Sequence, residues 1–347
     1  MEQSVTSSKV TIPLIDIRGK SFTDFISEHE TEARNVLLAA RNVLGVASRA
    51  AAFVLMPLAD RCSRRWLGRT DSPYLAEIDH CAEVVGMSGA HALNAAYEWA
   101  CTTGAFATGD DVTLMRVLDW GFPELGSRVV ALQADSPAGE YINLTWPGFT
   151  GSVNGLAPGR FAAAINIAPM RKHALTMIGD WVRNQQIVRQ PGGMPPAHLL
   201  RFVFENAKDF AAAKRMLAEI PVCAPVIYSL AGTKPGEGCI IERVEKSAFI
   251  RELGDNRSVT TSNHFHTPEL VQQGHGWRAR GVDSHGRFAQ SCTLIPEQLS
   301  TARDFEWLAA PILNWETRLA IIANAKSGRL IVQGFEGDQR VTEVFTM

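Results

Sequence analysis

The chain has 347 residues and a formal net charge of −2, with 46% apolar and 20% charged residues. This length and apolar content suffice for the core of one large domain or two ordinary ones, and the charged content is typical of a folded chain. Because there is no surplus of basic residues, the composition argues against a nucleic-acid partner. The six cysteines form no CxxC pair, which argues against a zinc ribbon, and their low density argues against a disulfide framework.

The N-terminal region begins with a short tail and a predicted strand within residues 1–20. No basic segment followed by an apolar one marks a secretory signal, so we expect a cytoplasmic protein. The most apolar stretch, residues 43–59, is short and is interrupted by Arg49 and Pro57. It therefore predicts a buried helix rather than a membrane span.

Apolar residues at three- and four-residue spacing predict helices over residues 22–67 and, after a break at 71–73, over residues 74–100. From Cys101 onward, short runs rich in β-branched residues alternate with turn signals and predict strands. Further helices are expected at 174–189, 195–206, 208–219, 267–274 and 295–310, and further strands at 225–231, 238–244, 247–252 and 257–262. This order favours an α+β fold in which two antiparallel sheets lie between helical layers, although periodicity leaves other α+β layouts open.

Cys101 lies where the predicted helices give way to strands. A turn at residues 109–111 predicts a hairpin in which Cys101 lies opposite the end of the next strand, near Arg116 and Asp119. Because Arg116 and Asp119 are three residues apart, a bulge or the end of the strand is needed to bring both to Cys101.

These residue types suit a thiol nucleophile. A nearby cation such as Arg116 stabilises a thiolate. If the peptide bond before Cys101 is cut, the new α-amine has a pKa of about 8 and can act as the base, with Asp119 holding its ammonium form. The alternative from the spacing alone is an ion pair beside a buried structural cysteine.

Four segments between residues 73 and 290 carry a family resemblance. They are YLAEIDHCAEVVGM with the later NAAYEWACTTGAF and LMRVLDWGF, then GFTGSVNGLAPGRFAAAIN, TTSNHFHTP and DSHGRF. Together they resemble the acid ceramidase and N-acylethanolamine acid amidase group of the cysteine N-terminal-nucleophile hydrolases. Choloylglycine hydrolase, penicillin V acylase and acyl-CoA:6-aminopenicillanic acid acyltransferase are relatives of that group.

The resemblance implies a four-layer αββα sandwich that needs no cofactor and cuts itself between Ala100 and Cys101. Cleavage would leave a helical N-terminal segment, residues 1–100, and a catalytic domain, residues 101–347.

Residue roles are also implied by the resemblance. Cys101 would be the nucleophile, and Arg116 and Asp119 would orient and polarise the thiol and its amine. Asn263 would donate its side-chain amide to the oxyanion, and Arg287 would support the site.

Three further residues are expected near the substrate. Asn154 is similar to a second oxyanion-side asparagine of the bile-salt hydrolases. Trp120 belongs to an aromatic group that forms either core or an apolar wall for an acyl chain. His264, next to Asn263, either lines the pocket or packs in the core, and the histidines lack the spacing of a metal site, so no metal is expected.

We therefore expect a self-processing amidase that opens a linear amide of an N-acyl compound with an apolar acyl group, through a Cys101 thioester. Two alternatives stay open: an acyltransferase that passes the same thioester to an amine, and a non-catalytic binding protein on the same fold. The expected partners are the small-molecule amide and the two cleaved fragments for each other. Membrane contact is not expected, and a homo-oligomer stays open.

Overall fold

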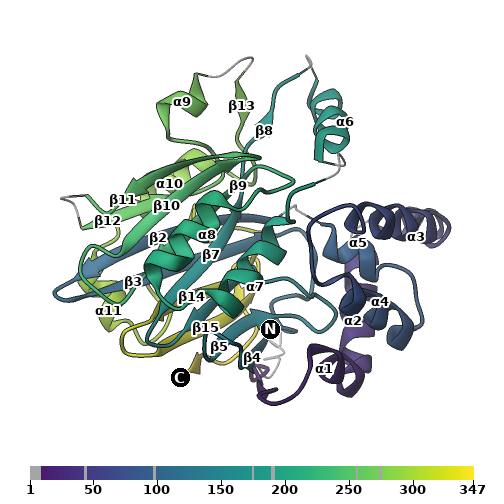
Figure 1. The fold of residues 1–347 in the computed structure, drawn as a ribbon, viewed down its shortest axis with the longest axis horizontal. Helices are drawn as coiled ribbons and strands as arrows, with labels where there is room; N and C mark the ends of the chain where they lie inside the picture. Colours follow the sequence, from purple (N-terminus) through teal and green to yellow (C-terminus); the bar gives the residue numbers. More distant parts are fainter. Residues whose placement is uncertain are drawn as a thin grey trace, which may run out of the picture.

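The computed structural model describes residues 9–42, 45–96, 99–173, 176–188, 192–254, 257–272 and 276–347. Within these ranges, two β-sheets stack face to face, helices cover their outer faces, and a separate group of helices lies beside them (Figure 1). The predicted αββα sandwich with a helical N-terminal segment is therefore confirmed.

The first sheet has eight strands in the order β1-β4-β5-β6-β7-β9-β10-β11. Their bounds are Leu14–Asp16, Val130–Ala134, Tyr141–Thr145, Asn154–Ala157, Phe161–Ile167, Val226–Ala231, Gly238–Val244 and Ser247–Glu252. β1 pairs in parallel with β4, whereas the other neighbours are antiparallel. Helices α7 (Pro196–Asn206) and α8 (Phe210–Glu219) pack on the outer face. Every residue of β7 is buried, because the strand lies between α7 and the second sheet.

The second sheet runs in the order β12-β2-β3-β14-β15-β16, with β17 also paired to β15. The bounds are Ser258–Thr261, Trp99–Thr108, Asp111–Trp120, Thr317–Asn324, Arg329–Glu336, Gln339–Arg340 and Phe345–Thr346. Helices α10 (Ser284–Ser291) and α11 (Pro296–Thr301) contact β2 from outside. Strand β2 therefore lies between β7 on one side and two helices on the other.

The N-terminal helices are α1 (Phe22–Glu28), α2 (Glu30–Asn42), α3 (Gly45–Leu67), α4 (Leu75–Val85) and α5 (Ala90–Asn94). A capping box between Ser21 and Asp24 starts α1. Gly86 ends α4 in the left-handed conformation, with φ of 63°, which glycine adopts without a steric cost.

Two predicted helices are longer than the observed ones. The run predicted over 74–100 ends with α5 at Asn94, and strand β2 already begins at Trp99. The helix predicted over 295–310 stops at Thr301, and a turn follows in which the Asp304 carboxylate accepts the N–H of Glu306. Ala95 and Ala96 after α5, and Phe305 and Leu308 after α11, still pack on the core, so the apolar spacing continues past the last helical turn.

A small projection contains α6 (Met177–Val188), α9 (Pro268–Val271) and the paired strands β8 (Met170–Arg171) and β13 (Trp277–Arg278), at the top of Figure 1. Among the described residues, no helix combines the length and apolar character that a membrane crossing requires.

Candidate active site

The predicted hairpin around Cys101 is formed by β2 and β3. Thr108 pairs with Asp111 across a two-residue turn that contains Gly109 at φ of +56°. Cys101 consequently pairs with Leu118, and Ala100, one residue earlier, pairs with Asp119. The hairpin is confirmed, but its register differs by one residue: Asp119 lies opposite Ala100 instead of Cys101.

The Cys101 thiol points between the two sheets and is fully buried. Arg116 donates from Nη2 to Sγ of Cys101 at 3.0 Å, and from Nη1 to the carbonyls of Val153 and Ile165 at 2.8 Å each. Burial raises the pKa of the Cys101 thiol to about 12, although the Arg116 charge opposes this. In the uncut chain the thiol is therefore protonated near neutral pH.

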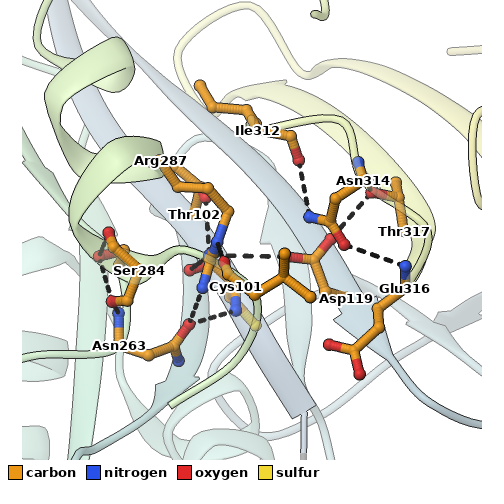
Figure 2. Close-up of polar contacts among 12 residues, drawn as sticks. Cys101, Thr102, Asp119, Asn263, Ser284, Arg287, Ile312, Asn314, Glu316 and Thr317 are labelled. Atoms are coloured by element: carbon orange, nitrogen blue, oxygen red, sulfur yellow. Dashed lines mark hydrogen bonds and ion pairs between the residues drawn. The ribbon is translucent and has the colours of Figure 1, made fainter. Parts of the chain in front are cut away.

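Asp119 lies on the other face of β3. Its Oδ2 is 3.5 Å from Nη1 of Arg287, and its Oδ1 accepts the hydroxyl of Thr317 at 2.9 Å (Figure 2). Burial raises the pKa of the carboxyl to about 6, with Arg287 opposing. The prediction that a bulge or the strand end would bring both Arg116 and Asp119 to Cys101 is wrong. Strand β3 alternates regularly, so the guanidinium of Arg116 reaches the thiol, whereas the Asp119 side chain lies on the other face and acts on Cys101 through its charge and its backbone.

Asn263 and Arg287 hold the backbone of Cys101. The N–H of Cys101 donates to Oδ1 of Asn263 at 2.8 Å, and Nη2 of Arg287 donates to the same oxygen at 2.9 Å. Nη1 of Arg287 donates to the Cys101 carbonyl at 2.6 Å. The Asn263 amide group donates to the carbonyl of Ile167 at 2.8 Å, so its predicted donation to an oxyanion stays a prediction.

The described side-chain contacts of Asn154 and Trp120 are with residues other than Cys101. Asn154 is buried on β6 and donates from Nδ2 to the carbonyl of Leu144 at 3.0 Å. Trp120 ends β3 and packs edge-on against Trp99 and Trp146, with ring centroids 5.5 Å apart in each pair. No described contact joins Asn154 to Cys101, whereas Trp99 and Trp120 flank the bond between Ala100 and Cys101 along the hairpin.

His264 lies beside Asn263 but faces α10. Its Nδ1 is 2.8 Å from Oγ of Ser284, and burial lowers its pKa to about 4. Its ring centroid lies 4.4 Å from that of His266 and 4.0 Å from that of His285. Within the described ranges, no three or more His, Cys, Asp or Glu side chains are arranged to hold a metal ion.

Asn166 on β7 ends the segment GFTGSVNGLAPGRFAAAIN of the family resemblance, but the sequence analysis assigned it no role. Its Nδ2 donates to the carbonyls of Cys101 at 3.3 Å and Ser262 at 3.0 Å, and its Oδ1 accepts the hydroxyl of Thr103 at 2.9 Å. The available signal was an asparagine that interrupts an apolar strand, because a fully buried amide needs several hydrogen-bond partners.

The peptide bond before Cys101 is closely covered by Gly281. A Cβ atom on this glycine, which has φ of +72°, would lie 2.3 Å from Cβ of Ala100 and 2.9 Å from Nη2 of Arg287. Only glycine allows this approach, so the bond that the resemblance marks for cleavage lies beneath the segment leading into α10.

A four-layer sandwich is the fold that the family resemblance predicted, and its strand β2 carries the buried Cys101. Human acid ceramidase is 29% identical over 105 residues, which are 30% of this chain and 25% of that protein. The N-acylethanolamine-hydrolyzing acid amidase of Cavia porcellus is 26% identical over 178 residues, which are 49% of this chain and 48% of that protein. The predicted resemblance is therefore confirmed.

Solved structures with a likeness to the chain include the Caenorhabditis elegans ortholog of that amidase, with a TM-score of 0.46, 17% identity, and 64% of this chain and 92% of that one covered. Penicillin V acylase from Agrobacterium tumefaciens has a TM-score of 0.41 and 12% identity, with 71% and 85% covered. No protein-family profile matches the chain. The chain spans about a quarter of the length of the acid ceramidases that it matches.

Proposed function

We propose that the chain is a self-processing amidase whose nucleophile is Cys101. The observation that carries this proposal is that the thiol, the N–H and the carbonyl of Cys101 each contact a different buried side chain. Arg116 contacts the thiol, Asn263 accepts the N–H, and Arg287 donates to the carbonyl. A merely structural cysteine needs none of these three contacts.

Self-cleavage would proceed by an acyl shift. Sγ of Cys101 attacks the carbonyl carbon of Ala100, the thiol gives up its proton, and the carbon–nitrogen bond breaks as the nitrogen gains a proton. Water then hydrolyses the resulting thioester, which leaves a carboxylate on Ala100 and a free thiol and amine on Cys101. Oδ1 of Asn263 already lies 2.8 Å from the nitrogen that becomes this amine.

Asp119 suits a role after cleavage. Its Oδ2 is buried and accepts no hydrogen bond from any described residue, although Arg287 lies nearby. A buried carboxylate oxygen without a donor is costly. Because Asp119 pairs with Ala100, cleavage at Ala100 would release the new ammonium group next to this residue on the hairpin. The ammonium could then bind there and provide a donor.

The mature site would hydrolyse an external amide by the same chemistry. The Cys101 thiolate attacks the carbonyl, the ammonium protonates the leaving amine, and the free amine then activates water against the thioester. An N-acyl amide with an apolar acyl group is the proposed substrate class. The curated relatives include an N-acylethanolamine-hydrolyzing amidase, and the cluster of Trp99, Trp120 and Trp146 beside the cut supports an apolar acyl group.

The test compares intact masses of the purified parent chain and of Cys101→Ala. We expect two parent fragments that meet between Ala100 and Cys101, and one uncut chain for the variant, because alanine supplies no sulfur to attack Ala100. A parent chain that stays whole for days from acid to neutral pH would contradict the proposal and favour a non-catalytic binding protein.

A further inference from the structure

A β-bulge lies opposite the candidate acid. Strands β14 and β3 pair regularly from Asn324 to Leu319, and Leu319 lies opposite Leu118. The next pair joins Thr317 to Asp119, so Arg318 has no partner and the register shifts by one residue. A bulge of this kind turns the following side chain to the other face of the sheet. Here it directs Thr317 towards the carboxylate of Asp119.

The hydroxyl of Thr317 is oriented by the turn that precedes it. The backbone N–H of Asn314 donates to Oγ1 of Thr317 at 3.0 Å, which occupies one lone pair of that oxygen. The hydroxyl proton is then directed to Oδ1 of Asp119, 2.9 Å away (Figure 2). Both side chains are fully buried, so water cannot replace this donor.

The turn itself is attached to the end of β3. The Asn314 side chain donates to the carbonyl of Ile312 at 3.2 Å and accepts the N–H of Glu316 at 3.0 Å. The carbonyl of Glu316 accepts the N–H of Trp120 at 2.8 Å. These bonds fix the turn relative to the strand that carries Asp119, so the Thr317 hydroxyl cannot drift from the carboxylate.

We propose that Thr317 is a positioning residue for Asp119, fixing Oδ1 so that Oδ2 stays directed at the amine that cleavage releases on Cys101. This inference rests on the proposed function. It also explains the bulge in β14. Regular pairing of β14 with β3 would need no bulge there.

The groups around Asp119 determine how loss of the Thr317 hydroxyl would change the pKa of Asp119. Arg287 and the hydrogen bonds from Asn314 and Thr317 lower the pKa of Asp119, whereas burial, which is the largest influence, and the charge of Glu316 raise it to about 6. On the inner face of the hairpin, Arg116 and Cys101 also interact with this charge. Removing the hydroxyl takes away one lowering influence, so the pKa of Asp119 should rise further.

The experiment compares Thr317→Val, Thr317→Ser and Thr113→Val with the parent after self-cleavage. Thr113 is a buried threonine on the same strand as Asp119, and its hydroxyl oxygen accepts from Asn324 at the far end of the β3–β14 pair. Two readouts are followed from pH 4 to 8. One is turnover of a fatty-acyl amide of 7-amino-4-methylcoumarin, and the other is alkylation of Cys101 by iodoacetamide, followed by mass.

We expect Thr317→Val to shift the acid limb of both pH profiles to higher pH by about one unit. The same variant should lower kcat about tenfold with little change in KM. Thr317→Ser, which keeps the hydroxyl, should restore the parent profile, and Thr113→Val should leave it unchanged. If Thr317→Val does not fold, Asn314→Leu removes the side chain that holds the turn and lowers the pKa of Asp119, and it should move the limb in the same direction.

Identical acid limbs for Thr317→Val and the parent would overturn the positioning role while self-cleavage in the parent stood. Equal changes in Thr317→Val and Thr113→Val would overturn it too, because they would reflect general loss of strand stability. A parent that neither cuts itself nor turns over the amide would instead refute the proposed function.

Discussion

At the scale of single residues, Cys101 is governed by opposing effects. Burial disfavours the thiolate and raises the pKa of the thiol to about 12, and the Arg116 guanidinium at 3.0 Å offsets only part of that cost. Cleavage would add a second cation, the α-ammonium, within the same residue. The thiol of the uncut chain is therefore expected to be unreactive, and the thiol of the cut chain reactive.

This difference can be measured by labelling with iodoacetamide at pH 7. In freshly isolated uncut chain, Cys62 and Cys292 are exposed and should be alkylated within minutes, while Cys101 stays unlabelled. After cleavage Cys101 should be labelled at least about 100-fold faster than before, because the pKa of its thiol falls by two or more units. Peptide masses identify each cysteine. Rapid labelling of Cys101 in the uncut chain would contradict the protonated, buried thiol.

At the scale of elements, the β2–β3 hairpin was predictable because its evidence is local. A turn with glycine between two β-branched runs determines which residues face each other, to within one position. Side chains alternate along β3, so Arg116 and Asp119 face opposite sides of the strand. The bulge that was expected in β3 is not present there. The bulge in β14 could not be predicted, since it depends on pairing with a strand about 200 residues earlier.

The N-terminal helices contain a histidine that joins three of them. His91 on α5 places Nδ1 3.1 Å from Asp60 on α3 and Nε2 2.8 Å from Asp79 on α4. Burial lowers the pKa of His91, but the hydrogen bonds to both carboxylates outweigh it, so the net pKa is raised above 6.5. Below that pKa both ring nitrogens carry protons and link the helices.

We expect His91→Gln to lower the free energy of unfolding by about 2 kcal/mol at acid pH, because a glutamine cannot donate to both carboxylates. A histidine whose pKa is raised on folding adds stability that is fully present below its unfolded pKa of 6.5 and is lost as the pH rises through the folded pKa. The difference between parent and variant should therefore shrink at alkaline pH. Denaturant unfolding of the Cys101→Ala background at several pH values measures it, and a difference independent of pH would exclude a charged His91.

At the scale of the whole molecule, the sequence pattern predicted the layers of the fold. It did not predict which distant residues meet at Cys101. Alternating blocks of strands and helices indicated two sheets between helical layers. The contacts of Cys101 with Asn263 and Arg287, however, join residues more than 160 positions apart, and only the family resemblance suggested them. Asn166 lies at the end of a segment of that resemblance but received no role, because a single polar residue in an apolar strand has no periodic pattern.

The two fragments produced by cleavage should remain together. Strand β1 of the N-terminal segment is part of the first sheet, and Arg201 on α7 binds Glu77 on α4 through two hydrogen bonds of 2.5 and 3.0 Å. Arg201 also lies over the ring of Tyr74, 4.2 Å from its centroid, and it is 5% exposed. Arg201 is buried but the Glu77 side chain is 24% exposed, so losing Arg201 removes the pair and its packing without leaving Glu77 fully buried.

We therefore expect residues 1–100 and 101–347 of the cut parent to elute as one species in gel filtration, and the fragments of Arg201→Met to separate at a lower concentration of urea. The matched control is Arg18→Ala, which removes an exposed ion pair to Glu140 that also crosses between the two fragments. Because solvent screens an exposed pair, this variant should behave almost like the parent. If the two variants release the N-terminal fragment equally, the buried Arg201 contact does not hold the fragments together, and the paired strand β1 and the apolar packing around it must do so instead.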